Sequence, residues 1–215
     1  IALSCGSSLE FLSLFNCKEI TNFSLEHLGG HCSSLRFLDL SSCQKLTDDG
    51  FKYLQFPDLQ TLNIEETQIS DQQASEILRK SSLLENVNFS FCSAISSKTL
   101  NQLTLCQNIK TLDISYCNSI NFDQLRAALR EINNLKELRL RGFSSLVSEM
   151  IDHPTLRSLD ISWCKDVENV AFNDLFKHLP NLESLDVSWC SQLSLSLLRC
   201  FSVSLRSFVA GGLLQ

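Results

Sequence analysis

Ten cysteines are the residues of this sequence with the most obvious chemistry. In a secreted miniprotein this number would indicate a disulfide framework, and beside histidines it could indicate a metal site. His27, His31 and Cys32 do have a loosely zinc-like spacing. However, Cys32 precedes a leucine by three residues, and Cys106 precedes an isoleucine by the same spacing. This recurrence indicates a structural position, so we expect no metal site.

Other combinations that could support catalysis are missing from the sequence. It contains no phosphate-binding loop, no glycine-rich nucleotide turn and no Ser-His-Asp ordering. Its four histidines fall on expected helix or loop positions. We therefore expect no enzyme activity, no cofactor and no small-molecule ligand.

The spacing of the cysteines indicates the architecture instead. Cys17 and Cys43 are 26 residues apart, and a pair near the end of the chain, Cys164 and Cys190, has the same spacing. A period near 25 residues is typical of a solenoid. Six cysteines, called the turn cysteines here, each close a segment of the form L-x-x-L-x-L-x-x-C. They are Cys17, Cys43, Cys92, Cys117, Cys164 and Cys190. Such segments begin at Leu9, Leu35, Leu59, Leu84, Ile109, Leu135, Leu156 and Leu182, with Thr67 and Phe143 replacing two of the cysteines.

Each segment predicts one strand followed by one helix. The alternating leucines predict a short strand with one apolar face. The cysteine fits as a small buried hydrophobic residue where the chain turns. Helices are expected to begin after the N-cap residues Thr21, Thr47, Ser70, Ser96 and Asn121. The fold class is therefore α/β, a right-handed horseshoe with a parallel sheet on the concave face and helices on the convex face.

Residues 1–215 form one domain of eight repeats and a partial ninth that begins at Leu205. The step from Phe143 to Cys164 is only 21 residues, so we expect residues 144–153 to form a loop with little or no helix. Both ends are apolar, whereas solenoid ends need a polar cap. We therefore expect this chain to be a fragment of a longer protein.

The repeat resembles the cysteine-containing class of leucine-rich repeats. The motif at residues 38–48, LDLSSCQKLTD, and the motif at residues 159–164, LDISWC, match that class residue by residue. The resemblance implies an F-box protein whose repeats present substrates to a ubiquitin ligase, although no F-box motif is visible in this sequence. Similar arrays in bacterial effectors that bind host proteins are the alternative. An enzyme, a metal protein or a structural spacer are more distant alternatives.

Two rows of residues are expected on the concave face, because each repeat position forms a column in a parallel stack. The strand row, between the second and third leucines, contains Ser13, Asp39, Asn63, Asn88, Asp113, Arg139, Asp160 and Asp186. Either Arg139 simply neutralises Asp113 and Asp160, or the row is an acidic stripe that meets a basic partner.

The turn row, which immediately precedes the cysteine position, contains Asn16, Ser42, Glu66, Phe91, Tyr116, Gly142, Trp163 and Trp189. Two aromatic pairs, Phe91 with Tyr116 and Trp163 with Trp189, flank a notch at Gly142. Either these rings cover the turn and pack on one another, or they form a binding hot spot with Arg139 and Arg141. Phe11, Phe15 and Phe37 could form a second patch, or they could contact a missing N-terminal flank.

We therefore expect a protein partner on the concave face. It would contact Phe91, Asp113, Tyr116, Arg139, Arg141, Asp160, Trp163, Asp186 and Trp189. The net charge of −6 argues against nucleic acid, and the short apolar runs argue against a membrane. Unpaired thiols favour the cytoplasm or nucleus, or the host cytoplasm for a bacterial effector.

Overall fold

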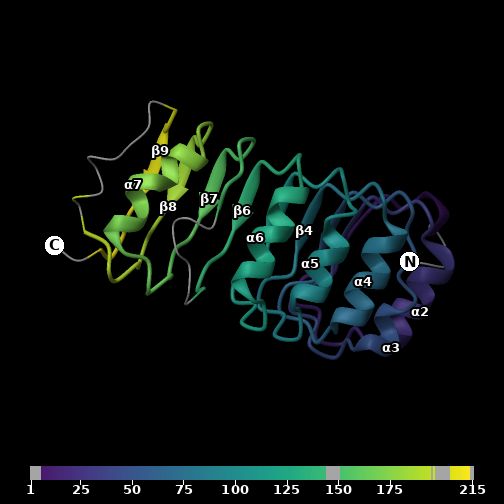
Figure 1. The fold of residues 1–215 in the computed structure, drawn as a ribbon. Helices are drawn as coiled ribbons and strands as arrows, with labels where there is room; N and C mark the ends of the chain where they lie inside the picture. The colour runs from purple at the N-terminus through teal and green to yellow at the C-terminus, as the bar shows by residue number, and fades with distance from the viewer. Residues whose placement is uncertain (1–5, 144–150, 195, 197–203, 214–215) are drawn as a thin grey trace.

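The strands form one parallel sheet in sequence order. The computed structural model describes residues 6–143, 151–194, 196 and 204–213. In those residues the sheet contains β1 (Phe11–Ser13), β2 (Phe37–Asp39), β3 (Thr61–Asn63), β4 (Asn86–Asn88), β5 (Thr111–Asp113), β6 (Glu137–Arg139), β7 (Ser158–Asp160), β8 (Ser184–Asp186) and β9 (Ser207–Val209). Each strand pairs with the next in the chain, which makes an elongated, open array (Figure 1). This architecture confirms the predicted solenoid.

The register follows from the leucine pattern. The middle residue of each strand opposes the middle residue of its neighbours, as Leu112 opposes Val87 and Leu138. These middle side chains are buried in β2 to β8, while the first residue of each of these strands is partly exposed. A shift of one residue would place the leucines in solvent, so the burial of one face fixes the register.

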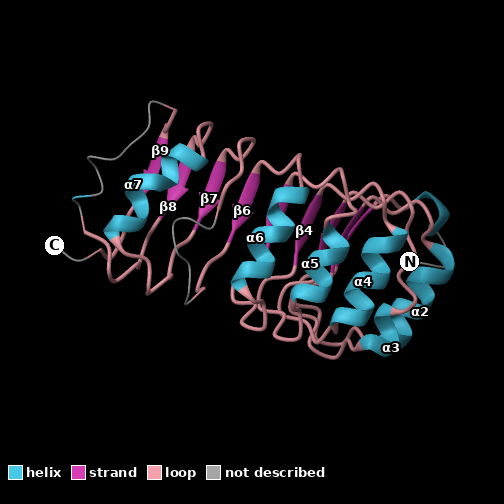
Figure 2. Ribbon diagram, in the orientation of Figure 1, coloured by secondary structure: helices cyan, strands magenta, loops and turns pink. Residues whose placement is uncertain are grey.

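The helices lie on one side of the sheet (Figure 2). They are α2 (Asn22–His31), α3 (Asp48–Phe51), α4 (Asp71–Lys80), α5 (Ser97–Leu103), α6 (Phe122–Glu131) and α7 (Asn169–His178), preceded by the 3₁₀ helix η1 (Gly6–Ser8). All five N-caps predicted from the sequence are confirmed. Ser70, Ser96 and Asn121 accept a backbone N–H with their side chains, as N-cap residues do.

The first residue of several helices also holds the next repeat. The Oδ1 atom of Asn22 accepts the N–H of Thr47 at 3.0 Å, and its Nδ2 donates to the Thr47 hydroxyl at 2.8 Å. Asp71 accepts the N–H of Ser96 in the same way. Burial would raise the pKa of Asp71, but the hydrogen bonds from the hydroxyls of Ser96 and Thr99, together with this N–H, lower it. These bonds join the convex layer of neighbouring repeats.

The segment expected to lack a helix falls mostly outside the described residues. Of residues 144–153, the structure describes only 151–153, and these are not helical. His153 is buried there, with its Nε2 atom 2.8 Å from the Ile132 carbonyl and its Nδ1 atom 3.2 Å from the Thr155 hydroxyl. The histidine occupies the position that Cys32 and Cys106 occupy in other repeats.

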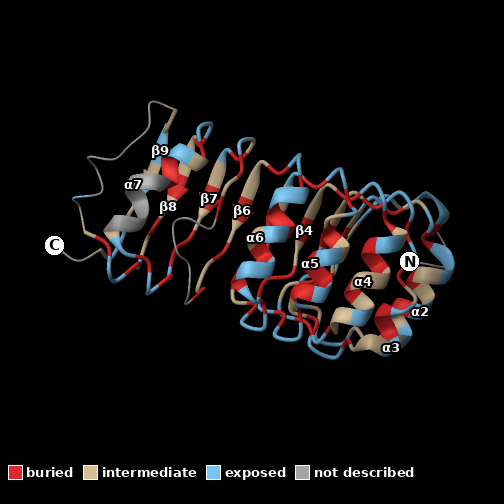
Figure 3. Cartoon of the chain, in the orientation of Figure 1, coloured by how far each residue is buried: buried red, intermediate tan, exposed pale blue. Residues whose placement is uncertain are grey.

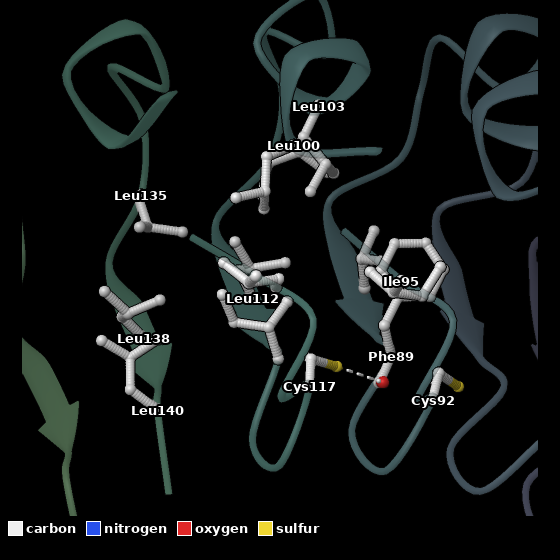
Figure 4. Packing of buried hydrophobic residues seen from close by; sticks show 14 of the residues in the cluster. Phe89, Cys92, Ile95, Leu100, Leu103, Leu112, Cys117, Leu135, Leu138 and Leu140 are labelled. Carbon is white, nitrogen blue, oxygen red and sulfur yellow. Dashed lines mark hydrogen bonds between the residues drawn. The ribbon is translucent and has the colours of Figure 1, made fainter. Parts of the chain in front are cut away.

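One continuous hydrophobic core fills the space between the sheet and the helices (Figure 3). The turn cysteines belong to it and also bond neighbouring repeats. The Cys117 thiol donates to the Phe89 carbonyl at 3.1 Å (Figure 4), and Cys43, Cys92, Cys164 and Cys190 make equivalent bonds to the preceding repeat. A thiol therefore fits this position as both a buried hydrophobic group and a weak donor.

Candidate protein-binding face

Every residue of the turn row has a left-handed backbone conformation. The φ angles are positive at Asn16, Ser42, Glu66, Phe91, Tyr116, Gly142, Trp163 and Trp189, and again at Gly212 in the last repeat. Only glycine, and to a lesser extent asparagine, adopts this conformation readily, while for a bulky side chain it is a genuine outlier. The fold therefore imposes the conformation, and the aromatic side chains are present despite their poor backbone preference.

The aromatic residues of the turn row stack in two pairs. The rings of Phe91 and Tyr116 have centroids 4.4 Å apart and planes 17° apart. Those of Trp163 and Trp189 are 5.1 Å and 17° apart. Phe91 is 47% exposed, Trp163 46% and Trp189 52%. The packing of the rings on one another is therefore confirmed, while Phe91, Trp163 and Trp189 keep about half of their surface exposed and Tyr116 is partly exposed. The binding hot spot stays a prediction.

Gly142 interrupts this stack, as the sequence predicted. A cavity of about 350 Å³ lies there, lined by Tyr116, Gly142, Trp163, Lys165 and Asp166. The Tyr116 ring covers the glycine, because a Cβ atom added to Gly142 would lie 2.2 Å from Tyr116 Cε1. Burial raises the pKa of Tyr116, and the nearby Arg141 opposes the shift. The notch is thus a slot beside the Tyr116 ring.

Sequence reasoning missed Lys165 and Asp166 as lining residues. They follow Cys164 directly, and the core pattern gives them no role. They follow Trp163 by only two and three positions, and this short distance could have indicated that the turn brings them beside the turn row.

The carboxylates and amides of the strand row support the backbone. Asp39 Oδ1 accepts the N–H of the residue two positions later, Ser41, at 3.0 Å. The same bond is made by Asn63, Asn88, Asp113, Asp160 and Asp186 to the residues two positions after each of them. This is the Asx turn, in which a side chain imitates a backbone acceptor. The acidic character of this row therefore has a structural cause.

The prediction that Arg139 neutralises Asp113 and Asp160 is wrong, because Arg141 does so instead. The register does place Arg139 between Asp113 and Asp160, but its guanidinium pairs with Glu137 at 3.5 Å. Arg141 instead pairs with both aspartates, at 3.3 Å to Asp113 and 3.5 Å to Asp160. Arg139 is the last residue of β6 and occupies the position where other repeats have Asp or Asn. Arg141 lies two residues later, in the turn that follows the strand.

Asp113 is not an exposed carboxylate. It is 2% exposed, so its charge is balanced within the fold by Arg141 and by the N–H of Ser115. Asp160 is balanced partly in the same way. The stripe of acids expected on the surface is therefore weaker at this point than the sequence suggested.

Three other features considered from the sequence are metal ligands, free thiols and the phenylalanines of the first repeats. Among the described residues, no group of histidines, cysteines or acids could hold a metal ion. Among the described cysteines, Cys17, Cys43, Cys92, Cys106, Cys117, Cys164 and Cys190 are free thiols. Burial raises the pKa of Cys106 and Cys190 to about 11 and that of Cys164 to about 12. The rings of Phe11 and Phe37 stack at 4.1 Å, and Phe11 and Phe15 are exposed at the N-terminal end of the sheet.

None of the helices in the described part of the chain has the length and hydrophobicity that a membrane span requires. The sheet, the repeated turn and the continuous core define a leucine-rich-repeat solenoid, a class of protein-interaction modules.

The family comparison narrows this class. Residues 2–115, more than half of the 215-residue chain, match the family model described as the leucine-rich repeats of the FBD-associated F-box protein At5g56370. Residues 152–174 match a general leucine-rich-repeat model. The chain therefore belongs to this leucine-rich-repeat family of F-box-associated proteins.

Solved structures show the same fold at low sequence identity. The leucine-rich-repeat protein LegL7 from Legionella pneumophila is 20% identical, with a TM-score of 0.61 over 97% of this chain and 76% of its own. TLR13, in a complex with the RNA ssRNA13, is 21% identical, with a TM-score of 0.61. That match covers 91% of this chain, which spans only 28% of the length of the TLR13 chain.

Proposed function

We propose that this chain is the substrate-recognition part of an F-box-type ubiquitin ligase receptor. The observation that carries the proposal is the match of residues 2–115 to the repeats of an F-box protein. The fold supports a binding role, because its repeated geometry presents a broad surface of adjacent strands and turns. The buried free thiols of Cys43, Cys92, Cys106, Cys117, Cys164 and Cys190 support an intracellular location.

The binding surface in this proposal is the second half of the sheet face and its adjoining turn row. Half-exposed aromatic rings beside arginine are the composition of a binding hot spot. In this surface Phe91, Tyr116, Trp163 and Trp189 contact the partner through their rings. Arg139, Asp160 and Asp186 contribute at the sheet, whereas the buried Asp113 acts indirectly by holding Arg141.

The alternative of a bacterial effector gains no specific support. The likeness to the Legionella protein, at 20% identity, establishes the shared fold alone. The family match favours the F-box assignment, and we therefore retain the ligase receptor as the single proposed function.

The test compares proximity labelling by the complete protein with that by the Trp163→Ala/Trp189→Ala variant in cells of the source organism. Proteins labelled only by the wild type are candidate substrates, and their ubiquitylation and lifetime are then measured with and without the protein. We expect at least one to lose ubiquitylation in the variant. A convex-side variant, Lys98→Ala/Arg126→Ala, serves as the control and should behave as the wild type does.

The proposal is refuted if the labelled partners keep the same ubiquitylation and lifetime when the protein is removed. Circular dichroism of both variants must first show a folded chain. If the tryptophan variant is folded and retains every partner, the binding surface lies elsewhere.

A further inference from the structure

The sixth repeat departs from the others at three surface positions at once. Its strand-row residue is Arg139, where six other repeats have Asp or Asn and form an Asx turn. Two residues later it has Arg141, where five other repeats have the serine that completes this turn. Its turn-row residue is Gly142, which lies between the two aromatic pairs. The core leucines of the repeat are unchanged, so these departures concern the surface alone.

The departures leave an open cavity, called the slot below, between the Tyr116 ring, which covers Gly142, and Trp163. Rings in adjacent repeats stack with centroids 4.4 Å and 5.1 Å apart. Tyr116 and Trp163 are two repeats apart, so their attachment points are separated by roughly 9–10 Å, twice the strand spacing. A flat group placed between them could contact both rings at ordinary stacking distance. The cavity of about 350 Å³ beside Gly142 lies in this interval.

The charges around the slot favour a cation. Three basic side chains, Arg139, Arg141 and Lys165, lie on the slot or on the strand and turn beneath it, together with four carboxylates, those of Asp113, Glu137, Asp160 and Asp166. The arginines are engaged by carboxylates, and Asp166 lines the cavity itself. The whole chain has a net charge of −6.

We propose that the slot between Tyr116 and Trp163 receives an arginine side chain from a basic segment of the protein partner, with Asp166 as its counter-ion. A guanidinium group is planar, weakly hydrated and stacks on aromatic faces, so it suits this combination of rings and carboxylate. This inference rests on the proposed function for the location of the surface and adds the chemistry of the partner. An RNA base could also stack there, but its phosphates would meet a net negative surface.

Lys165 gives the proposal an additional test. Its ammonium group lines the same cavity and repels an incoming cation. Lys165→Met removes that charge and keeps the length of the side chain, so it should bind an arginine peptide more tightly than the wild type, by about two- to fivefold.

The two tryptophans of the sequence are both in the turn row, so intrinsic tryptophan fluorescence reports on this surface alone. A displayed library of twelve-residue peptides is first selected against the chain. The best binder is then synthesised in two forms, one with arginine and one with citrulline, which has the same planar shape without the charge. We expect arginine at a fixed position in the selected peptides and at least tenfold weaker binding for the citrulline form.

Gly142→Phe should fill the slot. Other turn-row positions hold aromatic residues at φ angles of 59–64°, so the backbone accepts one, and the Tyr116 ring must tilt to restore one ring per repeat. We expect at least tenfold weaker peptide binding. Ser42→Phe adds a ring at the same turn position far from the slot and should change binding less than twofold. If Gly142→Phe fails to fold, Asp166→Asn is the second variant and should weaken binding at least fivefold.

Several results would overturn the proposal. These are a selection that yields no binder or no basic residue, normal binding by folded Gly142→Phe or by Asp166→Asn, and displacement of the peptide by single-stranded RNA. None of them bears on ubiquitylation in cells. The ligase role can therefore fail while the slot binds arginine, and the slot can fail while the ligase role is retained.

Discussion

Replacing Glu66 by glycine should leave the protein more stable than replacing it by alanine. Glu66 is an exposed turn-row residue with a φ angle of +55°. Its carboxylate accepts hydrogen bonds from Ser42 at 2.7 Å and Gln44 at 3.3 Å. Both substitutions remove these bonds equally, so the difference between the two variants isolates the backbone.

The expected difference follows from two opposing effects. An L-residue in the left-handed conformation costs about 1–2 kcal/mol relative to glycine. Glycine, in turn, loses more conformational entropy on folding, which costs roughly 0.5–1 kcal/mol relative to alanine. The balance leaves Glu66→Gly more stable than Glu66→Ala by about 0.5–1 kcal/mol. The usual order, in which alanine is the more stable replacement, is thereby reversed.

Urea denaturation followed by circular dichroism measures the difference, provided that the two variants unfold with the same dependence on urea. Ala127→Gly is the matched control. Ala127 is exposed in the interior of α6, where glycine should cost about 1 kcal/mol. Equal stability of the two Glu66 variants, or greater stability of Glu66→Ala, would show that the turn row does not hold its residues in the left-handed conformation.

Three further predictions concern the thiols, His153 and the Asx turn of Asp39. Thiol titration of the denatured protein without reductant should count ten free thiols, and a count of two or fewer would contradict this prediction. Alkylation of the native protein should be slow, because burial raises the pKa of the core thiols. Burial lowers the pKa of His153 below 6.5, and Lys136 adds to this shift, whereas the hydrogen bond with the Ile132 carbonyl and the charge of Asp152 oppose it. The free energy of unfolding should therefore fall as the pH drops below about 6.5. His153→Gln should reduce this acid sensitivity in pH-dependent melting, and an unchanged slope would refute the assignment. Asp39→Asn should keep the Asx turn and its stability, whereas Asp39→Ala should lose about 1 kcal/mol in urea denaturation, and equal losses would argue against a structural turn.

The elements of the fold that repeat were predictable from the sequence. The period-two leucines defined the strands and their buried face, because a strand of three residues has only one way to bury its middle side chain between apolar neighbours. The N-caps were predictable because Thr, Ser and Asn recur three or four residues after the cysteine position. The stacked pairs Phe91–Tyr116 and Trp163–Trp189 followed from the period alone.

The errors arose where one side chain chooses between several partners. The register could not distinguish Arg139 from Arg141 as the partner of Asp113, because that choice depends on rotamers and on which position lies in the strand. The left-handed turn was also missed, although Gly142 and Gly212 share its position and glycine favours positive φ. The pattern of an acid or amide two residues before serine, as at Asp160 and Ser162, would have indicated the Asx turn.

The fold constrains the side chains of the strand row more than those of the turn row. This difference indicates which row is better suited to partner recognition. A strand-row residue supplies an acceptor for the turn that follows, so its chemistry is constrained even where it faces solvent. A turn-row residue supplies only its left-handed backbone, which glycine would provide at lower cost. Bulky rings at Trp163 and Trp189 are therefore unfavourable for the backbone, and stacking offsets this only in part because about half of each ring surface is exposed. Their presence is best explained by a partner that covers the exposed half, which is the reason to seek recognition in the turn row first.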